Sequence, residues 1–308
     1  MLARTGVLSV LVAALAAGCG SNNPVVPTPV PPGGGAGSPA VLVGAGDIAD
    51  CFTDEVQGTA RLLDSIAGTV FTLGDNAYPD GSYRDFVRCF GPSWGDSSKL
   101  ILRNLHPSPG NHEHQTERAA PYYRYFGRRA GDPDKGYYAY DHGAWRVIVL
   151  NSELIVNNVF PPSSGKAQEN WLADELRSHA NTRCTIAYWH HPRFSSGWHG
   201  GDTRLDPVWR LLHEGGVDVV LNGHDHNYER FRPMNPAGTL DTARGIVQFV
   251  VGTGGTALRG FRRAVPNSVV RLEGHWGVLK LTLGRDEYRF AFLEPGGRVW
   301  DPGGGRCH

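Results

Sequence analysis

Short apolar runs recur along the chain, and most of them stop at a glycine or an asparagine. Short apolar runs bounded by such turn signals are typical of buried β-strands. The pattern predicts strands within residues 40–47, 69–76, 137–152, 184–192, 217–225, 245–255 and 276–283. The run at 137–152 has Asp141-His142-Gly143 near its middle, which predicts a hairpin turn there.

Two segments between these runs have helical periodicity instead, at residues 54–66 and 166–179. The second places Trp171, Leu172 and Leu176 on one face. Strands joined partly by helices and partly by hairpins indicate mixed sheets covered by helices, which is an α/β fold class. No second linker interrupts residues 40–308, so we expect one large domain there.

The N-terminal residues carry a targeting signal. Arg4 precedes an apolar run from Val7 to Ala17, which is shorter than the roughly 20 residues that span a bilayer. We therefore interpret residues 1–18 as a secretory signal peptide. The letters "LAAGC" resemble the bacterial lipoprotein box, which implies cleavage before a lipidated Cys19; an ordinary signal peptide cut nearby is the alternative.

Residues 19–39 are rich in Pro, Gly and Ser. They hold too few large apolar side chains to offset the entropy lost on folding, so we expect a linker. With a lipid on Cys19, this linker would tether the domain at the bacterial cell envelope, which makes the protein exported and membrane-anchored.

The charge balance of the chain bears on the kinds of partner that it can bind. The chain has 30 Lys and Arg against 30 Asp and Glu, so bulk charge does not favour a nucleic acid partner. No feature of the sequence indicates an obligate protein partner.

Beyond Cys19 an even number of cysteines remains, with no C-x-x-C pair, which permits two disulfides in three connectivities. The pairing we favour is Cys51 with Cys89 and Cys184 with Cys307.

The stretch "VLVGAGDIAD", residues 41–50, has two interpretations. Its glycines fit the G-x-G-x-x-G/A template of a dinucleotide site, or the stretch delivers Asp47 to a metal. A dinucleotide fold begins its helix at the second glycine, but here Asp47 puts a carboxylate at that place, and we expect the helix to begin near Thr53-Asp54. Asp75 follows the next run, where a ribose-binding acid could lie, so these two motifs leave both interpretations open.

Three further motifs favour a metal. "GNHE" (110–113), "WHHP" (189–192) and "GHDH" (223–226) concentrate His and Asn in loops, where a nucleotide site has no use for them. With Asp47 and "GDNAY" (74–78) they make five polar clusters, four directly after predicted strands, where open α/β sheets build their sites. Oxygen and imidazole ligands suit hard or borderline metal ions.

The five motifs in this order resemble the calcineurin-like metallophosphoesterase superfamily, and within it the purple acid phosphatases. The resemblance covers about residues 41–230 and continues weakly through "VVGTGG". It implies a four-layer α/β/β/α sandwich with two mixed sheets. Many members of the superfamily have a His where Ala49 stands here; purple acid phosphatases lack that His and supply a Tyr, which Tyr78 matches.

The resemblance also implies a ligand set. The first metal would be held by Asp47, Asp75, Tyr78 and His226, and the second by Asp75, Asn111, His190 and His224. Asp75 would bridge the two ions. In an extended segment His224 and His226 point inward while Asp225 points out. Because phenolate is a hard anionic ligand, we expect Fe³⁺ at the Tyr78 site and Zn²⁺, Mn²⁺ or Fe²⁺ at the second.

The reaction so implied is hydrolysis of phosphate monoesters by attack of a metal-bound hydroxide. His112 would steady the phosphoryl group or assist proton transfer, and His199 would protonate the leaving alkoxide. We expect Glu113 to accept hydrogen bonds from loop N–H groups rather than to bind metal. The alternatives are a phosphodiesterase or nucleotidase on the same site, a catalytically inert metal-binding surface lipoprotein, and a dinucleotide-dependent oxidoreductase.

Overall fold

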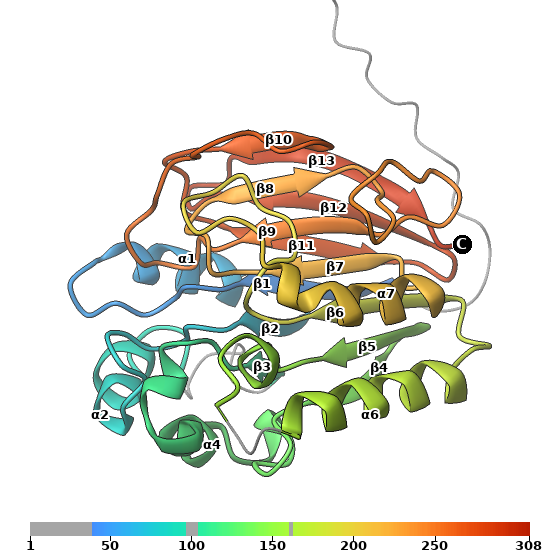
Figure 1. Ribbon diagram of the computed structural model, residues 1–308. Helices are drawn as coiled ribbons and strands as arrows, with labels where there is room; N and C mark the ends of the chain where they lie inside the picture. The colour runs from blue at the N-terminus through green and yellow to red at the C-terminus, as the bar shows by residue number, and fades with distance from the viewer. Residues whose placement is uncertain (1–38, 97–103, 160–162) are drawn as a thin grey trace, which may run out of the picture. The chain divides into compact units, whose positions relative to one another are not determined.

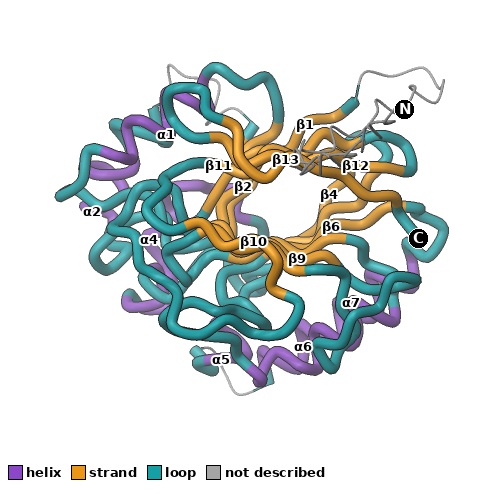
Figure 2. Tube along the Cα trace, turned by 90° about the horizontal axis from the view of Figure 1, so that it is seen from above, coloured by secondary structure: helices purple, strands orange, loops and turns teal. Residues whose placement is uncertain are grey.

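The computed structural model describes residues 39–96, 104–159 and 163–308. The predicted signal peptide, Cys19 and nearly all of the linker lie outside these residues. The strands form two sheets that face each other, with helices on the outer sides (Figure 1 and Figure 2). The six-stranded sheet has the order β13-β12-β11-β1-β2-β3, and the seven-stranded sheet has the order β10-β8-β9-β7-β6-β5-β4.

The strands of the two sheets have the following bounds. In the six-stranded sheet they are β1 (Ala40–Ala45), β2 (Thr69–Leu73), β3 (Leu105–Ser108), β11 (Val278–Leu283), β12 (Glu287–Leu293) and β13 (Val299–Arg306). In the seven-stranded sheet they are β4 (Tyr138–His142), β5 (Trp145–Val149), β6 (Cys184–Tyr188), β7 (Val219–Asn222), β8 (Tyr228–Phe231), β9 (Val247–Val251) and β10 (Ser268–Leu272).

Both sheets are mixed. β1, β2 and β3 run parallel, while β11 joins β1 in antiparallel register. In the other sheet β5, β6, β7 and β9 run parallel, and β4 and β8 are antiparallel to their neighbours. The turn between β4 and β5 passes through Gly143, which has a φ of 64°, so the predicted hairpin is confirmed.

Helices cover the sheets. They are α1 (Glu55–Asp64), α2 (Tyr83–Asp85), α4 (Ala120–Phe126), α5 (Glu153–Val156), α6 (Ser164–Ser178) and α7 (Asp206–Glu214), with the short helical turns η1 (Phe86–Phe90), η2 (Glu113–Gln115), η3 (Glu117–Ala119), η4 (Gly127–Ala130) and η5 (Thr203–Leu205). In the part of the chain that the structure describes, no helix is both long and apolar enough to span a bilayer.

Strand alternation explains the layers. In β6, Ile186 and Tyr188 belong to the core cluster that contains strands of both sheets, while Ala187 belongs to a second cluster with Leu172 of α6 and Trp209 of α7. Successive side chains of a strand point to opposite faces, so β6 is buried on both sides. The predicted four-layer α/β/β/α sandwich is therefore confirmed.

Two disulfides tie the layers. Cys51, after β1, bonds to Cys89 in η1, and Cys184, at the start of β6, bonds to Cys307, after β13. The second bond joins the two sheets. The pairing favoured from the sequence is confirmed.

Candidate metal centre

All five polar motifs lie just beyond the carboxyl ends of parallel strands. Asp47 follows β1, Asp75 follows β2 and Asn111 follows β3; His190 follows β6 and His224 follows β7. Because parallel strands end at the same edge of a sheet, residues far apart in sequence meet there. The expectation that only four motifs follow strands is too narrow, since "GNHE" follows the short strand β3.

The first group of side chains surrounds the hydroxyl of Tyr78. This oxygen lies 3.1 Å from Asp47 Oδ1, 3.2 Å from Asp75 Oδ2 and 3.4 Å from His226 Nε2. His226 Nε2 is also 3.4 Å from Asp47 Oδ1. All four side chains are buried.

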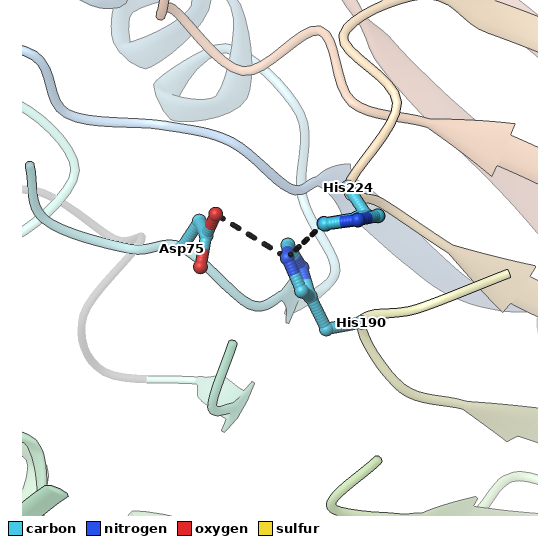
Figure 3. A group of neighbouring side chains, drawn as sticks. All are labelled: Asp75, His190 and His224. Atoms are coloured by element: carbon cyan, nitrogen blue, oxygen red, sulfur yellow. Dashed lines mark hydrogen bonds and ion pairs between the residues drawn. The ribbon is translucent and has the colours of Figure 1, made fainter. Parts of the chain in front are cut away.

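The second group surrounds the imidazole of His190, which is completely buried. Its Nε2 lies 3.3 Å from Asp75 Oδ2 and 3.2 Å from His224 Nδ1 (Figure 3). The same nitrogen lies 3.0 Å from Asn111 Oδ1. Ligand atoms of Asp75, His190 and His224 all lie within 4.8 Å of one another. Asp75 contacts both groups, so the structure brings the seven predicted ligands together as two overlapping sets.

The two sheets contribute different donor atoms. Loops of the six-stranded sheet supply the oxygen donors, which are Asp47, Asp75, Tyr78 and Asn111. Loops of the seven-stranded sheet supply the nitrogen donors, which are His190, His224 and His226. The centre therefore lies where an oxygen-rich edge of one sheet meets an imidazole-rich edge of the other.

Three of these residues have a left-handed backbone. The φ angles are 58° for Asp47, 49° for Asp75 and 72° for His224. Asp and His tolerate this region better than most residues, but it still costs of order 1–3 kcal/mol each and is concentrated at functional sites. Gly74, at φ 82°, precedes Asp75, and a Cβ there would lie only 2.6 Å from His190 Nδ1. The chain therefore requires a glycine at this point.

Backbone groups orient the carboxylates. His224 N–H donates to Asp47 Oδ2 at 2.8 Å, and His112 N–H donates to Asp75 Oδ1 at 2.9 Å. Glu113, also buried, accepts from Asn76 N–H and Gly110 N–H, both at 2.8 Å. Glu113 thus holds the "GDNAY" and "GNHE" loops together, which confirms its expected role.

Backbone carbonyls orient two of the histidines. Nδ1 of His190 lies 2.7 Å from Leu73 O, and Nδ1 of His226 lies 2.8 Å from Ala257 O. A carbonyl only accepts, so each Nδ1 carries a proton and each Nε2 is left to face the centre. This is the outer hydrogen bond that fixes ligating imidazoles in metal sites.

The electrostatics match a cation site. Burial would raise the pKa of Asp75, but His190 and His112 lower it, so the net pKa lies well below its usual range. Burial raises the pKa of the Tyr78 phenol far above its usual value, and the Asp75 and Asp47 carboxylates add to the rise. Two carboxylates and a phenolic oxygen buried together need positive charge nearby. The donor set therefore fits a pair of metal ions.

The two predicted catalytic histidines border the centre. The His112 ring packs 4.3 Å from the Tyr78 ring, and its Nε2 lies 3.7 Å from Asp75 Oδ2. The His199 ring lies 4.4 Å from the His224 ring, on the loop of residues 195–200. His199 Nε2 contacts the Arg259 guanidinium. A guanidinium only donates, so this nitrogen is an acceptor here, and any proton that His199 gives would have to leave from Nδ1.

Asp225 and Glu229 are functional residues that the sequence did not reveal. Asp225 does point away from the ligands, but the segment is not extended as expected, because His224 has a left-handed backbone. The Asp225 side chain is completely buried under the loop of residues 195–200. It accepts hydrogen bonds from His199 N–H at 2.8 Å, Gly200 N–H at 3.3 Å and the Ser195 hydroxyl. Glu229 accepts from Ser196 N–H at 2.8 Å. Both carboxylates therefore hold the loop that carries His199.

A cavity of about 200 Å³ opens beside the centre, lined by His191, His199, Gly200, Arg204 and His224. A larger cavity of about 280 Å³ lies elsewhere, along Arg230, Tyr288 and His308, and contains none of the predicted ligands. Of these two cavities, only the smaller one is lined by a predicted ligand, His224.

The dinucleotide interpretation does not fit this geometry. The first helix after β1 is α1, which begins at Glu55, well beyond Gly46. No helix N-terminus follows the second glycine, and the Asp47 carboxylate is completely buried among the donor atoms described above. The two glycines instead allow β1 to lie close to Phe71 and Leu73 of β2.

Comparison with known proteins decides the family. The profile of the calcineurin-like phosphoesterases matches residues 37–228. The chain belongs to the calcineurin-like phosphoesterase family. Members of this family and the purple acid phosphatases among them are built around a dinuclear metal centre, in agreement with the donor set.

Relatives and solved structures extend the comparison. Purple acid phosphatase 18 of Arabidopsis thaliana is 26% identical over 260 residues, 77% of this chain and 54% of the relative. A nucleotide pyrophosphatase/phosphodiesterase of Hordeum vulgare is 23% identical over 84% of this chain and 77% of the relative. The chain spans 40% to 54% of the length of three of the curated relatives that it matches, among them purple acid phosphatase 18.

The solved structure of purple acid phosphatase PPD1 from yellow lupin superposes with a TM-score of 0.71 at 19% identity, over 87% of this chain and 54% of that chain. GAP50 of Plasmodium superposes with a TM-score of 0.72 at 16% identity, over 88% of this chain and 90% of that chain. At these identities the likeness shows a shared fold.

Proposed function

We propose that this protein is an exported, lipid-anchored phosphatase that hydrolyses phosphate monoesters with two metal ions. The two ions would be Fe³⁺ at the Tyr78 site and Zn²⁺, Mn²⁺ or Fe²⁺ at the second site. The observation that carries the proposal is the convergence of seven donor side chains on Asp75, in two sets with the atom types that such ions prefer. The similarity to purple acid phosphatases supports the reaction class.

When bound, the two ions would supply Lewis acidity toward phosphoryl oxygens and lower the pKa of a water molecule. The residues of the chain do the rest. Asp75 lies between the two ligand sets and fixes their spacing, while the backbone N–H groups of His112 and His224 hold the carboxylates in place. We propose that His112, which is partly exposed at the edge of the centre, binds a phosphoryl oxygen through Nε2.

His199 is proposed to contact the leaving-group side. It is exposed, lines the cavity beside the centre and packs on His224. Burial of part of the ring lowers the pKa of His199, and the neighbouring Arg259 lowers it further, partly opposed by Asp225. The ring is therefore neutral at pH 7 and gains a proton only in acid.

The test is an elemental analysis of the purified protein with its visible spectrum. We expect iron together with a second metal, an absorption band in the visible and hydrolysis of nitrophenyl phosphate. In Tyr78→Phe the band should vanish, because the phenolate that ligates Fe³⁺ is its source. The Phe side chain retains the ring that packs against His112, so the substitution removes only the hydroxyl group. A colourless, iron-free protein with full activity would contradict the proposed metals.

Hydrolysis of phosphate diesters is the second candidate. The barley relative is named a nucleotide pyrophosphatase/phosphodiesterase, and it is matched over most of its length. An assay of one monoester and one diester of the same alcohol separates the two candidates. The catalytically inert surface lipoprotein would bind both metals and release phosphate from neither substrate.

A further inference from the structure

A positively charged segment, residues 257–265, borders the metal centre; we call it the arginine segment. It contains Arg259, Arg262 and Arg263, all exposed. Across the described part of the chain, the ion pairs of arginines involve other residues, and none of these three guanidinium groups pairs with a carboxylate. The chain as a whole has no net charge, so this concentration of unpaired positive charge is local.

The arginine segment is held against the centre by backbone hydrogen bonds. Arg259 N–H donates to His226 O at 2.8 Å, so it is attached directly to a predicted ligand. Arg262 N–H donates to Ser196 O at 2.9 Å, and Val265 N–H donates to Ser196 Oγ at 3.0 Å. A surface fixed in this way loses little entropy when it binds a ligand.

The Arg259 side chain faces the site. Its Nη1 contacts His199 Nε2, and the His199 ring lies 4.4 Å from the ring of His224. A guanidinium has five N–H donors, and this contact uses one of them. The remaining donors form a planar fork that suits a phosphate. Arg259 is therefore placed to bind an anionic group one step outward from the phosphoryl group at the centre.

Trp198 adds an aromatic surface next to His199. Its side chain is 58% exposed, and the Arg262 guanidinium lies 5.2 Å from the ring centroid. Indole rings are usually packed in the core, as Trp94, Trp145, Trp189 and Trp209 are here. An exposed indole beside a phosphate centre offers a face on which a nucleobase stacks, at about 1–3 kcal/mol per base.

We propose that Arg259 and Trp198 form a leaving-group subsite for nucleoside polyphosphates, in which Arg259 binds the second phosphate and Trp198 stacks on the base. The inference rests on the proposed phosphatase function and names its substrate class. With ADP, the oxygen of water bonds to the terminal phosphorus while the bond from that phosphorus to the bridging oxygen breaks. The products are AMP, inorganic phosphate and one proton, and the phosphate of AMP is the group that Arg259 holds.

The experiment compares ADP with AMP as substrates of the metal-loaded full-length protein. In AMP the leaving group is the neutral nucleoside, so the two substrates differ by the phosphate that Arg259 is proposed to bind. We expect Arg259→Ala to lower the ratio of kcat/KM for ADP to kcat/KM for AMP by about 10- to 100-fold, which is the loss of a charge-assisted hydrogen bond, because any effect through His199 is common to both substrates. Arg259→Lys should fall between.

Arg289→Ala is the matched control. Arg289 is exposed on β12, and its loss changes the net charge equally, so the ratio of the two kcat/KM values should stay at the wild-type level. In Trp198→Leu, kcat/KM for ADP should fall by more than kcat/KM for AMP, because the base of AMP lies one phosphate nearer the centre, while kcat/KM for glycerol 2-phosphate stays constant.

The outcomes separate the two proposals. Equal loss for ADP and AMP in Arg259→Ala, or no loss for either, overturns the subsite while phosphatase activity stands. A metal-loaded wild-type protein that hydrolyses none of the three substrates overturns the proposed function and the subsite together.

Discussion

Asp225 stands between two predicted metal ligands, but its contacts in the structure make it a support for the loop that carries His199. It stands between His224 and His226, but its carboxylate holds the loop of residues 195–200 through three hydrogen bonds. Asp225→Ala leaves those donors without their acceptor, at about 1–3 kcal/mol each if they stay buried. We expect kcat to fall by at least about 10-fold, as in His199→Ala, with the metal content unchanged.

The measurement is metal content together with kcat and KM on esters with good and poor leaving groups. Both Asp225→Ala and His199→Ala should affect poor leaving groups more than nitrophenolate. Asp134→Asn, at an exposed ion pair with Arg118, is the matched control and should match the wild type. Loss of metal from Asp225→Ala would show that this carboxylate instead maintains the ligand geometry.

His106 gives a prediction about acid stability. Its ring stacks 3.9 Å from the Tyr140 ring, and burial, with smaller contributions from His142 and Arg129, lowers its pKa to about 4. As the pH falls, His106 therefore becomes protonated in the unfolded chain before it does so in the folded protein. The contribution of His106 to stability is complete above pH 6.5 and declines as the pH falls from 6.5 toward 4.

Replacing His106 by Phe keeps a ring against Tyr140 and removes the titrating group. The loss in free energy of unfolding between pH 7 and pH 4.5 should be about 1–2 kcal/mol smaller in His106→Phe than in the wild type, after allowance for the solvent that still reaches the ring. Urea unfolding at the two pH values measures this difference. Identical losses in the two proteins would place the acid sensitivity elsewhere.

Sequence analysis found the metal ligands but missed residues whose interaction partners lie far away along the chain. The predicted ligands occur in short motifs whose letters are informative by themselves. Asp225, Glu229 and Arg259 act on the loop of His199, which is 26, 33 and 60 residues away along the chain. No local pattern announces such a contact, because it exists only after the two sheets have packed.

At the scale of elements, prediction followed side-chain patterning. The apolar runs of β1, β2, β6, β7, β9 and β11 are all found in the structure, as are α1 and α6. β3 is only four residues long and contains Pro107, and β13 contains Pro302 and three glycines, so neither has the composition of a strand. Both are edge strands, where a missing N–H donor is tolerated. Tertiary pairing, rather than local preference, makes them strands.

The two disulfides should differ in how much they stabilise the fold. The bond between Cys184 and Cys307 closes a separation of 123 residues, and the bond between Cys51 and Cys89 closes one of 38. In the chain-entropy account a longer loop gives more stabilisation, roughly 5 against 4 kcal/mol as upper values.

We therefore expect the Cys184→Ser, Cys307→Ser double variant to have a lower urea midpoint than the Cys51→Ser, Cys89→Ser variant, with the wild type highest. Equilibrium unfolding at matched metal content measures all three. The reverse order would mean that strain or structure in the unfolded chain outweighs loop entropy.

For the whole molecule, metal binding and folding are coupled, because the ligands come from loops of both sheets. An unfolded chain does not hold these ligands together, so each bound ion stabilises the folded state by about 2.7 kcal/mol when its free concentration is 100 times Kd. We expect a chelator-stripped protein to keep its circular dichroism spectrum but to melt several degrees lower, and metal addition to restore the melting temperature.

His190→Ala is the matched variant, since it removes a buried ligand of the second set. Its melting temperature should respond to added metal less than that of the wild type. A melting temperature indifferent to chelation in the wild type would mean that the two donor groups do not hold ions in the folded protein.

The division of donor atoms between the sheets has a consequence for how the centre can change over time. Substitutions of the oxygen donors, on loops of the six-stranded sheet, alter the preference for hard, highly charged ions. Substitutions of the imidazoles, on loops of the seven-stranded sheet, alter the affinity for borderline ions such as zinc. Each ligand set nevertheless takes donors from both sheets, because His226 belongs to the first set and Asn111 to the second, so a change on one sheet affects both metal sites. Asp75 contacts both sets directly, so a substitution there changes both metal sites at once.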